Sequence, residues 1–212
     1  MIVTLDGPGG TGKSTVSRVV AHKAGLPHLD TGAFYRAATL AVIESGVDPT
    51  RAEDVARVVS RTRMSQENER MYLDGRDVSA EIRGEAVTSA VSVVSAHQEV
   101  RAILVERQRE WVDRHDHRGV IEGRDIGSVV FPDATVKVYL DASPEVRARR
   151  RALQTGDDPA EVLDDLNRRD QFDSTRTASP MTVPDGATVI DTSQLGFEEV
   201  VERLLDMIRS KS

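Results

Sequence analysis

The run GPGGTGKS at residues 7–14 constrains this chain more than any other feature, because it fits the pattern G-x-x-x-x-G-K-[ST]. It follows the β-branched stretch 2–5 and precedes a helical pattern over 13–24 that closes at Gly25. Glycines let the backbone direct its N–H groups at phosphate oxygens, and a helix N-terminus adds partial positive charge. An ordinary glycine-rich turn is the alternative, but it does not explain both flanking elements. The run therefore predicts a P-loop that binds a nucleoside triphosphate.

Within such a loop the polar residues have separate tasks. Lys13 can reach the β- and γ-phosphates, and the Ser14 hydroxyl can ligate Mg²⁺. The residues expected to contact ATP are Gly7, Pro8, Gly9, Gly10, Thr11, Gly12, Lys13, Ser14 and Thr15. The chain lacks the Asn-Lys-x-Asp run with which a GTPase reads guanine. It also lacks the acidic pair that a mechanical ATPase usually carries at the end of an apolar strand.

Apolar strands alternate with helices along the chain, which predicts an α/β fold with a parallel five-stranded sheet in three layers. The expected strands are 2–5, 28–29, 120–121, 136–140 and 188–190. The expected helices are 13–24, 31–45, 48–61, 85–96, 99–115, 159–174 and 197–208, with one more beginning at Ser143-Pro144. The segment 30–92 contains helices and a small hairpin, 63–67 with 71–74, but no long core strand. We interpret it as an insert.

Composition narrows the class of protein further. The 212 residues suffice for one core, and 39% apolar with 30% charged residues is not typical of a membrane protein or a disordered chain. A net charge of −7 makes the chain a poor non-specific binder of nucleic acids or membranes. The absence of cysteine excludes disulfides and thiolate metal sites, and the start of the chain does not resemble a signal peptide. We expect a cytoplasmic protein.

The basic residues are unevenly chosen, because only four of the 28 are lysine and the others are arginine. A GC-rich genome favours arginine codons and is one explanation. The other is recognition of phosphates, since the planar guanidinium makes bidentate contacts. Arg124 follows the strand 120–121, and Arg36 lies one helical turn beyond 28–29. Both are expected at the carboxyl edge of the sheet, where open α/β sheets bind ligands.

Two further groups of arginines follow later in the chain. Arg169, Asp173 and Arg176 are spaced by four and three residues, so the acid can orient both arginines on one face. A basic cluster precedes the loop 155–159, which we expect to be mobile: Arg147, Arg149, Arg150 and Arg151. For any single arginine a solvated ion pair is the simpler explanation. Four groups at one edge of the sheet favour phosphate binding.

The sequence resembles the bacterial cytidylate kinases, a family of nucleoside monophosphate kinases. Besides the P-loop, the resemblance rests on DTGAFYR at 30–36, DVSAEIR at 77–83 and GRDIGSVVFP at 123–132. It extends to the arginine-bearing helix and covers nearly the whole chain. The last two runs are more specific to this family than the P-loop is.

The resemblance implies a CORE domain over 1–29, 93–147 and 169–212, an insert over 30–92 that binds the nucleoside monophosphate, and a LID over 148–168. It also implies the residues that contact CMP. The acceptor phosphate would be held by Arg36, Arg124 and Arg176, cytosine would be read by Ser92, Arg101 and Asp125, and the ribose would be contacted by Arg169 and Asp173. Thr31 belongs to the same set and keeps the hydroxyl of the serine common at that position.

The implied activity is ATP-dependent phosphorylation of CMP and dCMP to CDP and dCDP with Mg²⁺, and we expect a monomer. Lys13, Arg124 and Arg150 are the expected catalytic residues. CMP is largely a dianion at pH 7, so it needs no general base, and catalysis is positioning plus neutralisation of two anions. Asp125 is expected to accept a hydrogen bond from the cytosine amine, unless it serves only as an ion-pair partner that orients an arginine.

Two other functions remain open from the residues alone. A kinase of small-molecule hydroxyls, such as a shikimate kinase, would share the scaffold but would need a carboxylate base beside its acceptor. A P-loop binding or switch module would bind nucleotide and turn over slowly. The arginines at the acceptor position favour a nucleoside monophosphate kinase.

Overall fold

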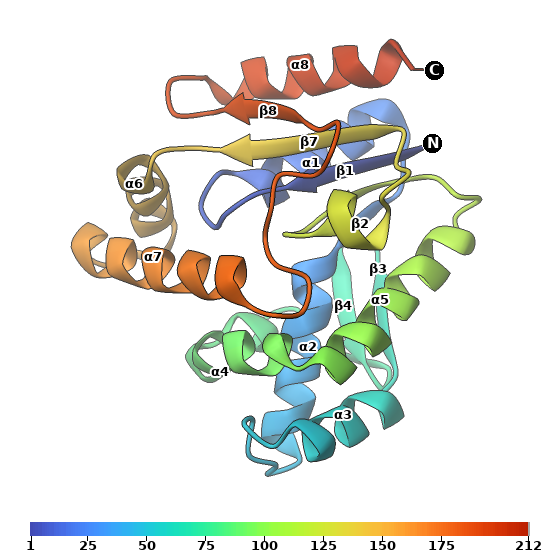
Figure 1. Cartoon of the computed structure of the whole chain (residues 1–212), viewed down its shortest axis with the longest axis vertical. Helices are drawn as coiled ribbons and strands as arrows, with labels where there is room; N and C mark the ends of the chain where they lie inside the picture. The colour runs from blue at the N-terminus through green and yellow to red at the C-terminus, as the bar shows by residue number, and fades with distance from the viewer. Residues whose placement is uncertain (212) are drawn as a thin grey trace. The chain divides into compact units, whose positions relative to one another are not determined.

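A computed structural model describes residues 1–211 of the chain. Its main sheet has five strands in the order β2-β6-β1-β7-β8, which confirms the five-stranded sheet predicted from the sequence (Figure 1). The strands of this sheet are β1 (Ile2–Asp6), β2 (His28–Asp30), β6 (Gly119–Glu122), β7 (Val136–Asp141) and β8 (Thr188–Asp191). β1 pairs in parallel with β6 and β7, and β7 pairs in parallel with β8.

The chain divides into two compact units, Met1–His28 with Val112–Ser212, and Leu29–Trp111. The first unit contains most of the main sheet and four α-helices: α1 (Lys13–Ala24), α6 (Pro144–Thr155), α7 (Pro159–Thr175) and α8 (Phe197–Arg209). The second unit contains the three-stranded sheet and the remaining helices: α2 (Thr31–Glu44), α3 (Ala52–Arg61), the short 3₁₀ helix η1 (Glu81–Arg83), α4 (Glu85–Ala96) and most of α5 (Gln98–Asp113). No helix within residues 1–211 has both the length and the apolar character that a membrane span requires.

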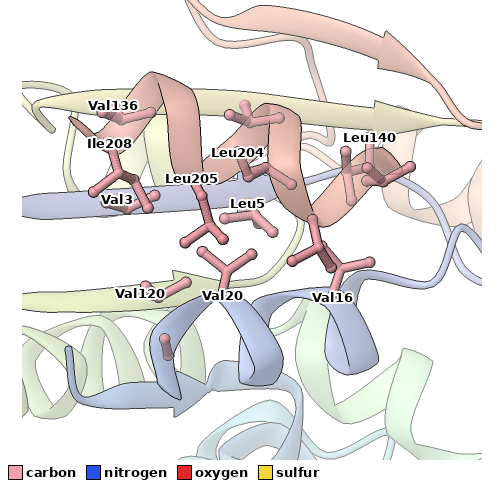
Figure 2. Close-up of a cluster of buried hydrophobic side chains, with 14 of the residues drawn as sticks. Val3, Leu5, Val16, Val20, Val120, Val136, Leu140, Leu204, Leu205 and Ile208 are labelled. Atoms are coloured by element: carbon pink, nitrogen blue, oxygen red, sulfur yellow. The ribbon is translucent and has the colours of Figure 1, made fainter. Parts of the chain in front are cut away.

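The core of the first unit lies between its sheet and two helices. Figure 2 shows Val16 and Val20 of α1 directed toward Leu204 and Leu205 of α8, with Leu5 of β1 between them. All five side chains are almost fully buried. Burying one side chain of this size stabilises the fold by about 1.5–3 kcal/mol. This packing fixes the end of β1 and the start of α1, the two elements that hold the P-loop.

Local signals set several helix ends where the sequence predicts them. α1 ends at Gly25, whose φ of 62° lies in the left-handed region that favours glycine. α6 begins at Pro144 with Ser143 as its N-cap, and the Ser143 hydroxyl accepts a hydrogen bond from the Val146 N–H. α6 and α7 then pack side by side through Ala148, Ala152, Val162 and Leu166.

The second unit differs from the sequence prediction in two places. The predicted hairpin is a three-stranded antiparallel sheet of β3 (Met64–Glu67), β4 (Arg70–Leu73) and β5 (Arg76–Asp77). The sequence predicts Asp74-Gly75 as the turn by which the chain leaves the hairpin, but this turn leads into β5, which pairs with β4. Helix α3 begins at Ala52 and not at residue 48, because the Asp48 carboxylate accepts hydrogen bonds from both the N–H and the hydroxyl of Thr50 and forms a turn.

One element of the first unit has no counterpart in the sequence prediction. Residues Ile126–Val130 form a single turn of π-helix, η2, shortly after β6. Turns of this kind occur often at functional sites. This one follows directly after Arg124 and Asp125, two of the residues expected to contact CMP.

Candidate active site

The P-loop joins the end of β1 to the start of α1, and its path requires glycine. Gly7 and Gly10 have φ values of 138° and 80°. A Cβ at Gly7 would lie 2.0 Å from the carbonyl oxygen of Leu140, and one at Gly10 would lie 2.9 Å from that of Arg147. Gly12 is the N-cap residue of α1 and has no side chain to cap it. The first N–H groups of α1 therefore suit an anion.

Lys13, the first residue of α1, is buried at the P-loop, with 6% of its surface exposed. Its ammonium group donates hydrogen bonds to the Pro8 carbonyl oxygen at 2.6 Å and to the Thr11 hydroxyl at 3.4 Å. Burial and, to a smaller extent, the positive charge of Arg124 lower the pKa of Lys13 to about 7, against the opposing effect of nearby acids. A bound anion would therefore stabilise the charged form of this buried lysine.

The hydroxyl of Ser14, an exposed residue, begins a short chain of polar groups that leads into the protein. It donates a hydrogen bond to the Glu122 carboxylate at 2.9 Å, and that carboxylate lies 3.6 Å from Nε2 of His28. The same His28 nitrogen is 2.9 Å from the Ser17 hydroxyl. Sequence reasoning did not assign a role to Glu122. Its place at the end of an apolar strand was the available signal.

These oxygens fit the chemistry of a magnesium site. Mg²⁺ prefers hard oxygen ligands and is usually bound by one or two side chains together with substrate phosphates and water. Ser14 and Glu122 offer a hydroxyl and a carboxylate within hydrogen-bond distance of each other, beside the P-loop. Within residues 1–211 there is no cluster of three or more His, Cys, Asp or Glu that could hold a metal alone.

The carboxylate of Asp173 in α7 binds two arginines, Arg124 and Arg176. Its carboxylate accepts hydrogen bonds from Nε of Arg124 at 3.2 Å and from Arg176 at 3.3 Å. Arg124 also donates to the Gly7 carbonyl oxygen at 3.0 Å, so it touches the P-loop directly. The predicted orientation of Arg176 by Asp173 is confirmed. Arg124 is a second arginine bound by Asp173, which the spacing did not predict, and the charge of Asp173 also acts on Arg169.

Two further predicted residues lie in this cluster. Asp125 is buried, and one of its carboxylate oxygens lies 3.5 Å from the Arg176 guanidinium. The structure thus gives Asp125 an ion pair with Arg176. Burial lowers the pKa of Arg169, and the charge of Arg124 adds to that effect. Positive charge is concentrated here, as a site for a phosphate requires.

Two arginines of the basic cluster in α6, Arg147 and Arg150, form hydrogen bonds within the protein. Arg147 is buried and donates to the Gly9 carbonyl oxygen at 3.1 Å, and it forms an ion pair with Asp170 of α7. Arg150 donates to the hydroxyl and the carbonyl oxygen of Thr192, at 2.9 and 2.7 Å. Arg147 therefore connects α6 both to the P-loop and to α7.

The remaining candidates lie in the second unit. Arg36 donates to the Ile82 carbonyl oxygen at 3.1 Å and to the Thr88 hydroxyl at 3.0 Å. Arg101 is only 3% exposed and lies over the Tyr35 ring, 5.1 Å from its centre. A helical arginine would be expected at the surface, so its burial was not predictable from residue type. Two other candidates are in helices of this unit, Thr31 at the start of α2 and Ser92 in α4.

A parallel sheet of five strands with a P-loop after its first strand defines the class of P-loop kinase folds. The structure resembles the crystal structure of an uncharacterized protein from Eubacterium ventriosum, with a TM-score of 0.58 and 10% identity, covering 99% of this chain and 98% of that one. It also resembles a sugar kinase from Janibacter, with a TM-score of 0.52 and 16% identity, covering 98% and 94% of the two chains. At such low identity these similarities concern the fold.

Sequence comparison identifies the family within this class. The family model for cytidylate kinase matches residues 3–210. The chain is 48% identical over 219 residues to the cytidylate kinase of Mycobacterium leprae, covering 100% of this chain and 97% of that protein. It is 44% identical over 215 residues to the cytidylate kinase of Caldanaerobacter subterraneus, covering 99% and 95%. The chain belongs to the cytidylate kinase family.

Proposed function

We propose that this chain transfers the γ-phosphoryl group of ATP to CMP and dCMP, giving ADP with CDP or dCDP. An oxygen of the acceptor monophosphate attacks the γ-phosphorus, and the bond from that phosphorus to the β–γ bridging oxygen breaks. Membership in the cytidylate kinase family supports this function. The structural observation that carries it is the pair of arginines that Asp173 fixes beside the P-loop.

On the donor side, the N–H groups of the P-loop and the Lys13 ammonium bind the triphosphate. Lys13 is placed to neutralise charge that develops between the β- and γ-phosphates. We propose Ser14 and Glu122 as the protein groups that hold Mg²⁺ with its phosphates. The ion would supply neutralisation of phosphate charge when bound.

On the acceptor side, the proposal assigns the CMP phosphate to Arg124 and Arg176, with Arg36 from the second unit. No carboxylate base is needed, since the second pKa of a phosphate monoester is about 6 and the attacking oxygen is already ionised at pH 7. A hydroxyl kinase would need such a base. Asp173 is occupied by Arg124 and Arg176, and Asp125 faces Arg176, which disfavours that alternative.

The remaining assignments follow the family pattern. Asp125 would read the cytosine amine with Ser92 and Arg101, Arg169 and Asp173 would contact the ribose, and Thr31 would add a hydroxyl. We assign the segment 30–92 to acceptor binding and 148–168 to a LID whose closure excludes water. Arg150 would act from α6 on the transferring phosphate once it leaves Thr192.

A coupled assay of ADP release tests this function. Purified protein with Mg²⁺ and ATP is offered CMP, dCMP, UMP, AMP, dTMP and shikimate in parallel. The proposal expects CMP and dCMP to be preferred over every other acceptor. A preference for shikimate or another hydroxyl acceptor would contradict it. ATP binding without turnover on any acceptor would instead indicate a binding module.

A further inference from the structure

The carboxylate of Asp6 holds the segment that follows β6. Asp6 is the last residue of β1 and is completely buried. Its two oxygens accept hydrogen bonds from the N–H groups of Ile126 and Gly127, each at 2.7 Å. These N–H groups begin the π-helical turn Ile126–Val130. Asp6 thus caps this turn from a different strand, 120 residues away in the chain.

The residue that would ordinarily cap this turn is used otherwise. Asp125 occupies the N-cap position, where an aspartate side chain commonly accepts hydrogen bonds from the first turn. Here the Asp125 side chain makes no capping bond. Its carboxylate lies toward Arg176 instead, with 3.5 Å between the charged groups. Because Asp6 already satisfies the N–H groups, the Asp125 carboxylate need not.

The contact between β1 and this turn is close, which limits how far the turn can shift. A Cβ at Gly127 would lie 2.8 Å from the Thr4 hydroxyl oxygen and 3.2 Å from the Asp6 carboxylate. It would also lie 3.1 Å from the Pro184 ring. Glycine at position 127 therefore allows the backbone to approach the end of β1.

Two more bonds connect the same segment to the start of the P-loop. The Gly123 N–H donates to the Leu5 carbonyl oxygen at 3.0 Å, and Arg124 donates to the Gly7 carbonyl oxygen at 3.0 Å. Residues 5–7 therefore hold residues 123–127 from both ends. Asp6 contributes the only ionisable group among residues 5–7. Burial raises the pKa of Asp6 to about 6, while the bonds from Gly127 and Ile126 and the charge of Lys13 favour the ionised form.

We propose that Asp6 is a positioning residue for acceptor selection: it caps η2 and thereby leaves Asp125 directed toward the acceptor nucleotide. This inference rests on the proposed function, because it takes Asp125 as a reader of cytosine. Asp6 itself touches no substrate. It acts through the backbone at residues 126 and 127.

The test is Asp6→Asn, with Asp141→Asn as its matched control. The Asn side chain keeps the shape but can accept only one of the two N–H bonds, since its amide nitrogen is a donor. Asp141 is the last residue of the neighbouring strand β7, and its carboxylate is exposed. We expect Asp6→Asn to lower the ratio of kcat/KM for CMP over UMP by about tenfold, the range of one lost charge-assisted hydrogen bond. In Asp6→Asn the KM for ATP should change by less than about twofold. In the control Asp141→Asn the CMP/UMP ratio of kcat/KM should also change by less than about twofold.

A double-mutant cycle with Asp125→Asn separates positioning from stability. If Asp6 acts through Asp125, adding Asp6→Asn to Asp125→Asn should lower the CMP/UMP ratio no further. Amide hydrogen exchange gives a readout apart from activity, with faster exchange expected at residues 126 and 127 in Asp6→Asn. Should Asp6→Asn fail to fold, Gly127→Ala disturbs the same contact without changing a charge and should lower the same ratio.

Three results would overturn the inference: an unchanged CMP/UMP ratio in a folded Asp6→Asn enzyme, independent effects in the cycle, or unchanged amide exchange. A wild-type protein that does not phosphorylate CMP would instead refute the proposed function. The amide-exchange comparison would then still decide whether Asp6 holds the turn.

Discussion

Replacing Lys13 by methionine should abolish turnover and yet stabilise the fold at pH 7. Burial lowers the pKa of this lysine from its ordinary value of 10.5 to about 7. At 1.36 kcal/mol per pKa unit, the depressed pKa costs the folded protein about 4 kcal/mol at pH 7. Methionine removes this cost, but it also removes the hydrogen bonds to Pro8 and Thr11, each worth about 1 kcal/mol.

The expected net gain is therefore about 2 kcal/mol in the free energy of unfolding. For a chain of this length that corresponds to a rise in Tm of about 4–8 °C. Turnover should fall by at least about 10²-fold, because the charge acts on the phosphates in the transition state. Activity and stability would then move in opposite directions, as expected where a site keeps a buried charge for its ligand.

The stability cost of the buried Lys13 depends on pH. Because the folded pKa lies below the unfolded one, the cost is fully present below about pH 7 and disappears as the pH rises toward 10.5. The stability advantage of Lys13→Met should consequently vanish near pH 10, where only the lost hydrogen bonds remain. Denaturant unfolding of the nucleotide-free proteins at pH 7 and pH 10 measures this difference.

A matched control is available in the same helix. Lys23 of α1 forms exposed ion pairs with Glu198 and Glu202, so Lys23→Met should change stability by no more than about 1 kcal/mol at either pH. A Lys13→Met protein that is less stable than the wild type at pH 7 would show that the buried lysine carries no such cost. A gain in stability of the same size at both pH values would show that the gain does not come from the lysine charge.

The other substitutions concern the acceptor. Asp173→Asn should raise the KM for CMP by about 10- to 150-fold and leave the KM for ATP nearly unchanged, because the carboxylate binds two arginines. Steady-state kinetics that show equal losses for both substrates would contradict this role of Asp173. Asp125→Asn should lower the CMP/UMP ratio of kcat/KM by about tenfold, since the amide can donate to uracil O4, whereas equal losses on CMP and UMP would leave Asp125 as an ion-pair partner only. In calorimetric titrations, Arg36→Lys should bind CMP almost as poorly as Arg36→Ala, because an ammonium cannot make a bidentate contact.

Most elements of the fold were predictable because their signals are local. The glycines of the P-loop, the Ser143 cap and the Gly25 stop each act within a few residues of their own helix. β5 was missed because two residues, Arg76 and Asp77, show no alternation of apolar and polar side chains. Its pairing with β4 is set by the tertiary structure.

The parts of the site that could not be predicted depend on contacts between distant residues. Arg124 and Gly7 are 117 positions apart, and the capping bond from Asp6 crosses 120. Residue type was misleading for Arg101 and Arg147, since a charged side chain predicts exposure and both are buried. In each case the guanidinium finds backbone carbonyl groups that no sequence pattern reveals. The sequence resemblance, in contrast, singled out Arg101 without explaining how it is held.

The depressed pKa of Lys13 also couples nucleotide binding to protons. With a pKa of about 7, the free amine is mostly neutral at pH 8, and contact with the phosphates of ATP should raise its pKa again. ATP binding at pH 8 should therefore take up close to one proton, and binding at pH 6 should take up almost none at this residue. Calorimetric titrations in two buffers of different ionisation enthalpy measure that uptake. Lys13→Arg provides the comparison, because a guanidinium stays protonated throughout. Equal proton uptake by both proteins at pH 8 would show that the proton enters elsewhere and that Lys13 is already charged before the nucleotide arrives.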